Sequence, residues 1–126
     1  MDMRTPLGKV RGLGSAKEGT DHFWRQRLTA VANVPLLTFF VIFIMTYAGA
    51  PHADVVAALA NPFVAVVMAL VVISALTHMR IGMQVIVEDY VHAEGIKIVL
   101  LMLNTFFAIA VGGLCLFAIL KLAFAG

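Results

Sequence analysis

The sequence has only one cysteine, Cys115, and it lies inside an apolar segment. One cysteine cannot form an intrachain disulfide, a CxxC redox pair or a cysteine-based metal cluster, so we expect it to pack as a small hydrophobic residue. The chain also lacks a flavin-binding fingerprint and a catalytic triad. A complete redox enzyme is therefore not expected within this chain alone.

Charge is scarce as well. Only 13% of the 126 residues are charged, whereas 62% are hydrophobic and the mean hydropathy is +0.99, which predicts an integral membrane protein. The formal net charge is +2, and most of the cations lie in one flank. The residues that precede the first apolar run are Arg4, Lys9, Arg11, Lys17, Arg25 and Arg27. This distribution favours membrane lipid as a partner and does not indicate nucleic acid.

Three apolar stretches, at about 28–48, 55–87 and 96–124, are each longer than the roughly 20 residues that a helix needs to cross a bilayer. In lipid the backbone must satisfy its own hydrogen bonds, so the stretches are expected to be helices. The basic N-terminus does not read as a cleavable signal, because the run after it is long enough to span. The sequence predicts an all-α membrane protein with a cytoplasmic or interfacial segment 1–27 and a three-helix transmembrane domain 28–126.

The orientation follows from the Lys and Arg residues beside the spans. The N-terminal flank holds six, the first loop "GAPHADV" none, the second connection two, Arg80 and Lys97, and the C-terminal tail only Lys121. The positive-inside rule then predicts a cytoplasmic N-terminus and a C-terminus on the opposite side. Residues 77–92 would lie at the cytoplasmic end of the second span.

Small and polar residues in the spans predict helix contacts. Asn33 and Pro35 in the first span indicate a kink or a polar contact with a neighbouring helix. Gly112 and Gly113, with Ala108 and Ala110 one turn earlier, offer the third span a smooth face for close packing.

His78 is the first candidate functional residue, because an ionisable side chain in a membrane span is costly and marks a functional site by default. A neutral imidazole is a common axial ligand of haem iron, and a single histidine leaves the other axial position to another chain. Gly82, at i+4, shares the face of His78 and leaves space where a flat ring could approach. The competing interpretation is a histidine that bonds a neighbouring helix. His22, His52 and His92 lie in flanks or loops and are expected at the surface.

Asp89 and Tyr90 form a second candidate site. Eleven residues at about 100° each bring Asp89 back to within about 20° of His78, whereas Tyr90 lies about 120° away and about 18 Å further along the axis. A phenol beside an acid can donate to a quinone carbonyl and help supply protons, with Asp89 fixing its orientation. The alternative is a solvated helix end.

Arg27 and Arg80 are candidate partners for an anionic group such as a haem propionate. Arg27 opens the first span and Arg80 follows His78, so both could lie near the cytoplasmic side. Snorkelling to lipid phosphate explains them equally well.

Two stretches resemble a known family. "HMRIGMQVIVEDYV" closely resembles the second-helix motif of the small hydrophobic membrane anchor subunit of succinate dehydrogenase, respiratory complex II, and "FWRQRLTAVANVPL" resembles the start of the first helix in its bacterial members. The resemblance covers roughly Gly14 to the C-terminus. It implies that His78 is an axial ligand of haem b and that Tyr90 bonds a ubiquinone carbonyl, with Asp89 in support. It also implies that Arg27 lies near the propionates.

The resemblance implies a membrane anchor of succinate:ubiquinone oxidoreductase, an enzyme of the tricarboxylic acid cycle and the respiratory chain. This chain would pack with a cytochrome b556 subunit, which shares the haem, into a helical bundle, and would hold a flavoprotein subunit and an iron–sulfur subunit at the membrane. It would be non-catalytic on its own. The N-terminal motif favours a bacterial cytoplasmic (inner) membrane over a mitochondrial inner membrane.

Two other functions remain open. A small proton or cation transporter subunit could relay charge through His78, Glu88 and Asp89. It would need polar residues along at least two helices, and the third span offers only Asn104 and Thr105. A structural anchor without haem would use His78 only to bond a neighbouring helix.

Overall fold

The computed structural model describes residues 3–12 and 18–125, and within these ranges every regular element is an α-helix. The elements are α1 (Pro6–Arg11), α2 (Glu18–Tyr47), α3 (His52–Ala60), α4 (Pro62–Tyr90) and α5 (Glu94–Ala125). Three helices are long and apolar enough to cross a membrane, over Gly19–Tyr47, Pro62–Tyr90 and Glu94–Phe124. The prediction of an all-α protein with three membrane-spanning helices is confirmed. Of the predicted segment 1–27, residues 1–2 and 13–17 lie outside the described ranges.

The predicted second span, 55–87, is wrong as a single helix. Asn61 is extended, with φ −68° and ψ 121°, and separates α3 from α4. Its side chain accepts a hydrogen bond from the Phe63 N–H at 2.9 Å and so caps α4, while Pro62 occupies the first turn. A proline at this position starts a helix well and disfavours helical geometry at the residue before it, so the chain breaks here.

The first span begins earlier than predicted, at Glu18 rather than near residue 28. The added residues are polar but helical, and one of their contacts is an ion pair between Asp21 and Arg25, one turn apart, with N···O 3.2 Å. Such i,i+4 pairs add modest support to a helix. Hydropathy marks only the apolar part of α2.

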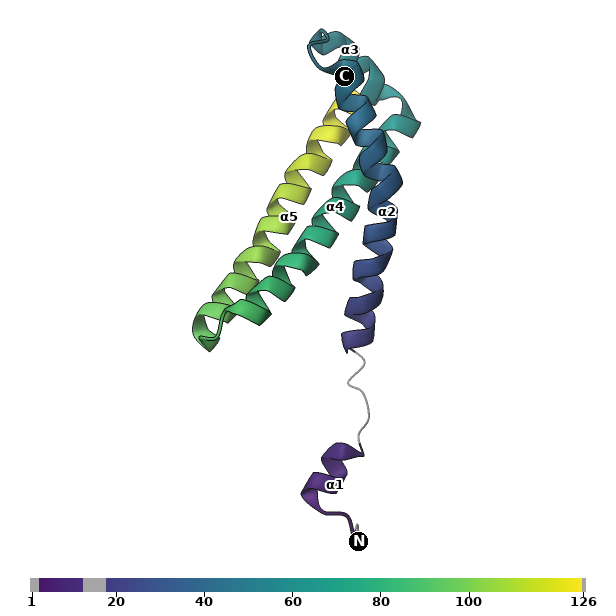
Figure 1. Cartoon of the computed structure of the whole chain (residues 1–126). Helices are drawn as coiled ribbons and strands as arrows, with labels where there is room; N and C mark the ends of the chain where they lie inside the picture. The colour runs from purple at the N-terminus through teal and green to yellow at the C-terminus, as the bar shows by residue number, and fades with distance from the viewer. Residues whose placement is uncertain (1–2, 13–17, 126) are drawn as a thin grey trace.

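Short connections set the topology (Figure 1). Residues 91–93 link α4 to α5, so these two helices form an antiparallel pair. After α2 the chain turns at Gly49, whose φ of 78° is a left-handed conformation that suits glycine. The first turn of α2, the end of α4 and the start of α5 therefore lie toward one side of the bundle, and α3 lies toward the other.

Helix α4 is the centre of the molecule. It makes the principal contacts of both α2 and α5, which have no comparable contact with each other, while α3 packs against α4 and α5. A Cβ added to Gly112 would lie 3.2 Å from Leu76 Cδ1, so this glycine permits the close approach of α5 to α4. The predicted close packing is confirmed at Gly112 and at buried Ala108, whereas Gly113 faces open space and Ala110 is exposed.

The bundle has a very small core of its own. Among the described residues, the buried ones are Leu59, Val71, Ser74, Ile81, Val87 and Ala108. Large apolar side chains such as Leu28, Val34 and Leu114 are each 70% exposed. Helices that are apolar on every side require an apolar environment, which lipid or other membrane helices supply.

Candidate functional site

A row of polar side chains, hereafter the polar seam, lies between α2 and α4. Its members on α2 follow helical spacing, as do those on α4, so each set occupies one face of its helix. The polar seam consists of Gln26, Thr29 and Asn33 on α2 and Ser74 and His78 on α4. It is the principal set of side-chain hydrogen bonds between these helices in the described part of the chain.

His78 is half-buried and bonds α2 through its Nδ1 atom, which lies 3.1 Å from Thr29 Oγ1. The Thr29 hydroxyl donates within its own helix, to the Arg25 carbonyl at 2.8 Å, with the Gln26 carbonyl at 3.1 Å. A hydroxyl has a single proton, so toward His78 it acts as an acceptor. A hydroxyl that donates to Arg25 can bond His78 only if the imidazole carries its proton on Nδ1.

The tautomer with the proton on Nδ1 is favoured because both hydrogen-bond donors, the Thr29 hydroxyl and the His78 ring N–H, then have an acceptor. With the proton on Nδ1, the hydroxyl and the imidazole each donate one hydrogen bond. With the proton on Nε2, the hydroxyl must turn to Nδ1 and its bond to the Arg25 carbonyl is lost. One additional hydrogen bond is worth about 1 kcal/mol.

The other ring nitrogen, Nε2, has no hydrogen bond within the described residues. It carries a lone pair in this tautomer, and that lone pair is the group that binds a metal ion. The described residues contain no group of three or more His, Cys, Asp or Glu side chains arranged to hold a metal ion. The chemistry of His78 therefore fits a cofactor that takes one ligand from this chain and another from elsewhere.

The neighbouring pair in the polar seam is Ser74 and Asn33. The Ser74 hydroxyl lies 2.7 Å from Asn33 Oδ1 and 3.5 Å from the Thr29 carbonyl oxygen. The predicted polar contact of Asn33 with a neighbouring helix is thus confirmed, and α2 remains helical through Pro35. Ser74 is buried, so this contact ties α2 to α4 one turn from His78.

Gly82 lies on the side of α4 that faces α2. A Cβ added there would have only one atom within 4 Å, Gln26 Nε2 at 3.9 Å, so the glycine is not required by a tight contact in this chain. The sequence predicted space for a flat ring beside His78 at this glycine, and that role stays a prediction. The structure adds that the Gln26 amide borders the space.

His22 and Gln26 lie one turn apart on α2 and carry unpaired buried atoms. His22 Nε2 and Gln26 Oε1 are both buried without a hydrogen-bond partner in the described ranges. The surface position expected for His22 is wrong, since its side chain is half-buried. Buried polar atoms are normally paired, so these two atoms are exceptions among the described residues.

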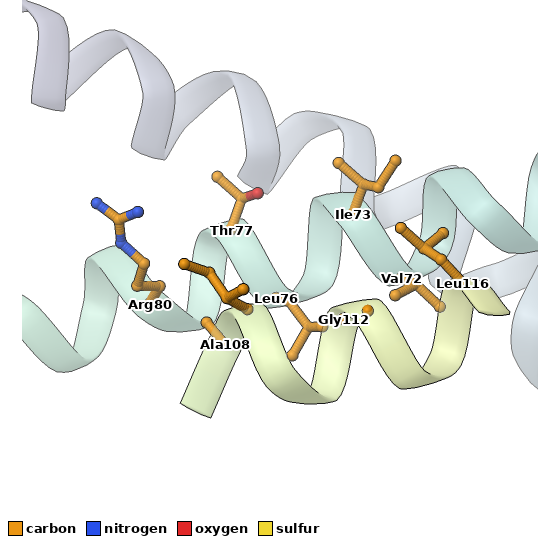
Figure 2. A pocket seen from close by; sticks show the side chains of 10 residues that line it. Val72, Ile73, Leu76, Thr77, Arg80, Ala108, Gly112 and Leu116 are labelled. Carbon is orange, nitrogen blue, oxygen red and sulfur yellow. The ribbon is translucent and has the colours of Figure 1, made fainter. Parts of the chain in front are cut away.

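The two candidate arginines lie in different surroundings. Arg27 is exposed, and its guanidinium stacks over the Phe23 ring at 4.0 Å from the centroid, a cation–π contact. Arg80 is half-buried and lines a cavity of about 260 Å³ between α4 and α5 (Figure 2). Two residues turn a helix by about 200°, so Arg80 and His78 point to nearly opposite sides of α4.

Arg80 also marks a contact of α5 with α4. Its carbonyl oxygen accepts a hydrogen bond from Asn104 Nδ2 at 2.9 Å. In Figure 2 the Arg80 side chain lies at one end of the cavity, and Gly112 and Leu116 of α5 lie further along it. The polar residue Asn104, which the sequence offered for a transport path, is engaged with the backbone of α4.

Asp89 and Tyr90 are the last residues of α4, and both are exposed. The helix is continuous from His78 to Tyr90, so the axial separation of about 18 Å holds. Neither side chain forms a hydrogen bond or ion pair with the described residues, and the structure brings neither of them to His78. The two candidate positions are therefore separate.

The residues that sequence reasoning missed are Thr29, Gln26 and His22. Their signal is the spacing of polar residues at 22, 26, 29 and 33 along one face of α2. That spacing becomes visible only when the helix is extended back to Glu18. A helix assumed to start near residue 28 places His22 and Gln26 in a flank.

Comparison with known proteins reveals relatives over most of the chain. The sequence model of the family described as succinate dehydrogenase/fumarate reductase transmembrane subunit matches residues 1–112. The chain is 36% identical over 86 residues to the succinate dehydrogenase hydrophobic membrane anchor subunit of Paracoccus denitrificans, covering 68% of this chain and 67% of that protein. It is 29% identical over 108 residues to the Rickettsia bellii protein of the same name, covering 86% of each.

A third relative is the succinate dehydrogenase membrane anchor subunit of Reclinomonas americana, which is 30% identical over 98 residues, covering 75% of this chain and 82% of that protein. No solved structure matches the chain significantly.

Proposed function

The chain belongs to the succinate dehydrogenase/fumarate reductase transmembrane subunit family, and from this premise we propose that it is the small anchor subunit of a succinate:ubiquinone oxidoreductase. It contributes one axial ligand of haem b and part of the ubiquinone site. Its partners are the flavoprotein, iron–sulfur and cytochrome b556 subunits, in a bacterial cytoplasmic membrane. Succinate is oxidised on the flavoprotein, and this chain acts where the electrons reach quinone.

One observation carries the haem proposal: His78 uses Nδ1 to bond Thr29 and leaves Nε2 available. When bound, haem b supplies a one-electron iron couple whose potential depends on its axial ligands and their hydrogen bonds. His78 would hold the iron from α4. The resemblance places Arg27 near a propionate, but Arg27 is two residues from Thr29 and so points to nearly the opposite side of α2, as Arg80 does on α4 relative to His78. Either arginine would therefore meet a propionate only through its long, flexible side chain.

The quinone proposal concerns Tyr90. Its phenol is exposed at the end of α4 and is free to donate a hydrogen bond to a quinone carbonyl. Asp89 is adjacent in sequence and can accept a proton or a hydrogen bond near the same carbonyl. By the positive-inside prediction this end of α4 faces the cytoplasm, the side on which the soluble subunits would deliver electrons.

A reduced-minus-oxidised optical spectrum of the purified complex tests the haem proposal. We expect His78→Ala to abolish the low-spin b-type signal. The matched control is His52→Ala, at the first residue of α3, which should leave the signal intact. A b-type spectrum that survives His78→Ala would contradict the proposal.

One observation favours the structural anchor without haem, namely that His78 does bond a neighbouring helix. That bond occupies one of two ring nitrogens, so it fits both functions. The same spectrum separates them, because an anchor without haem has no b-type signal to lose.

The polar seam does not support the transporter alternative. From Gln26 to Asn33 it extends only about 10 Å along α2, and His22 adds about 6 Å, against the roughly 30 Å of a hydrocarbon core. In α4 the residues between Pro62 and Ser74 are all apolar. A proton path along these helices would end halfway.

A further inference from the structure

We infer that Thr29 is a positioning residue for His78: by accepting a hydrogen bond from Nδ1–H it selects the tautomer that presents the Nε2 lone pair to haem iron. This inference rests on the proposed function and extends it to a residue on a second helix. Its basis is the pair of hydrogen bonds that the Thr29 hydroxyl makes in the two directions.

The direction of the Thr29 hydroxyl is set inside α2. A threonine in a helix favours rotamers that let Oγ1 bond the carbonyl one turn earlier. Here the Arg25 carbonyl receives the proton at 2.8 Å. The oxygen lone pairs are thereby left to face α4, where His78 Nδ1 lies at 3.1 Å.

Two other threonines of α2 show that the bond within the helix is not the distinguishing feature. Thr38 Oγ1 donates to the Val34 carbonyl at 2.6 Å, and Thr46 Oγ1 donates to the Ile42 carbonyl at 2.8 Å. Both are exposed, and neither bonds another helix in the described structure. Thr29 differs by its contact with His78.

The position of Thr29 along the helix axis, relative to His78, is set by the next contact in the polar seam. Buried Ser74 lies 3.5 Å from the Thr29 carbonyl oxygen and 2.7 Å from Asn33 Oδ1. Sliding of α2 along α4 would break these contacts together. The distance between Thr29 and His78 is therefore a property of the packed helix pair.

Removal of the acceptor should weaken the ligand in two ways. The imidazole loses the bond that disfavours the Nε2-protonated tautomer, which cannot bind iron. It also loses a hydrogen bond that makes the ligand more electron-donating. We expect haem affinity to fall about tenfold, the lower end of the range for such outer partners, and the haem midpoint potential to become more positive.

The test uses the assembled complex with Thr29→Val, which keeps the shape of the side chain and removes the hydroxyl. We expect a lower haem-to-flavin ratio, a more positive haem midpoint potential and an altered low-spin haem signal in electron paramagnetic resonance. Thr29→Ser, which keeps the hydroxyl, should restore all three. Thr38→Val is the matched control and should have no effect.

Ser74→Ala separates the hydroxyl of Thr29 from the packing around it: it removes the contact that sets the level of α2 against α4 but keeps the Thr29 hydroxyl, so it should shift the potential less than Thr29→Val. The inference is overturned if Ser74→Ala and Thr29→Val shift the potential equally, if Thr29→Ser fails to restore it, or if Thr29→Val leaves it unchanged. Should Thr29→Val not assemble, Thr29→Cys, whose thiol is a weak acceptor, must show the positive shift in the assembled complex. A b-type signal that survives His78→Ala would instead refute the proposed function itself.

Discussion

Tyr90 is the residue at which the quinone proposal can be tested most directly. Its side chain is 77% exposed, and Tyr90→Phe removes only the hydroxyl. We expect quinone reductase activity to fall about tenfold, as for loss of one hydrogen bond of about 1.4 kcal/mol to the reacting carbonyl. Succinate oxidation with an artificial acceptor should persist.

The other tyrosine of the chain supplies the control for this experiment. Tyr47 ends α2 on the opposite side of the bundle and packs against Phe43, with ring centroids 4.8 Å apart. Tyr47→Phe should leave both activities intact. Equal loss of both activities in Tyr90→Phe would point to failed assembly, and full quinone reductase activity would remove Tyr90 from the site.

Individual residues of the candidate site were predictable to different degrees. His78, Gly82, Asp89 and Tyr90 belong to one helix, whose fixed rotation and rise relate them before any packing is known. Thr29 was not predictable in this way, because its role depends on how α2 packs against α4. The roles of these residues toward haem and quinone stay predictions.

At the scale of the element, the packing of α5 on α4 depends on one of two adjacent glycines. A Cβ added to Gly112 would lie 3.2 Å from Leu76 Cδ1. A Cβ added to Gly113 would have no atom within 4 Å. We expect Gly112→Leu to destabilise the helix pair by about 1–3 kcal/mol, the usual cost of overpacking. The purified complex should lose activity at a lower temperature than the wild-type complex.

Gly113→Leu is the matched control for that prediction, because both substitutions gain the same helix propensity. The difference between the two variants then reports packing alone. Equal thermal inactivation of the two would show that Gly112 is not needed for the approach of α5, unless a partner helix also covers Gly113. Assembly with the other subunits, measured by the yield of complex, distinguishes that case.

The helix boundaries show which features can be predicted from hydropathy and which cannot. Three spans were predictable because apolarity is a property of each residue in turn. The break at Asn61 was hidden because Asn-Pro is a helix start embedded in an apolar run. The start of α2 at Glu18 was missed for the opposite reason, since those residues are helical but polar.

For the whole molecule, the main physical fact is the mismatch between its small core and its large apolar surface. The helices α2 and α5 each touch α4 along one face and leave their remaining faces apolar and exposed. The unpaired atoms of His22 and Gln26 lie on the same α2 face as the polar seam. A partner therefore has ample apolar surface to cover on α2 and α5, away from the face of each helix that packs on α4.

The orientation of the whole chain is the last prediction, and its cysteine content makes the test simple. Cys115→Ser leaves the given sequence without a thiol, so the label on this chain, separated from its partner subunits by electrophoresis, reports only an introduced cysteine. Into it we would place His52→Cys or His92→Cys, two exposed positions on opposite sides of the bundle. The positive-inside rule predicts that His52→Cys reacts with a membrane-impermeant maleimide in intact spheroplasts. His92→Cys should react only after lysis in detergent. The reverse pattern would place Tyr90 on the side away from the cytoplasm, and with it the quinone site would be out of reach of soluble subunits that deliver electrons from the cytoplasm.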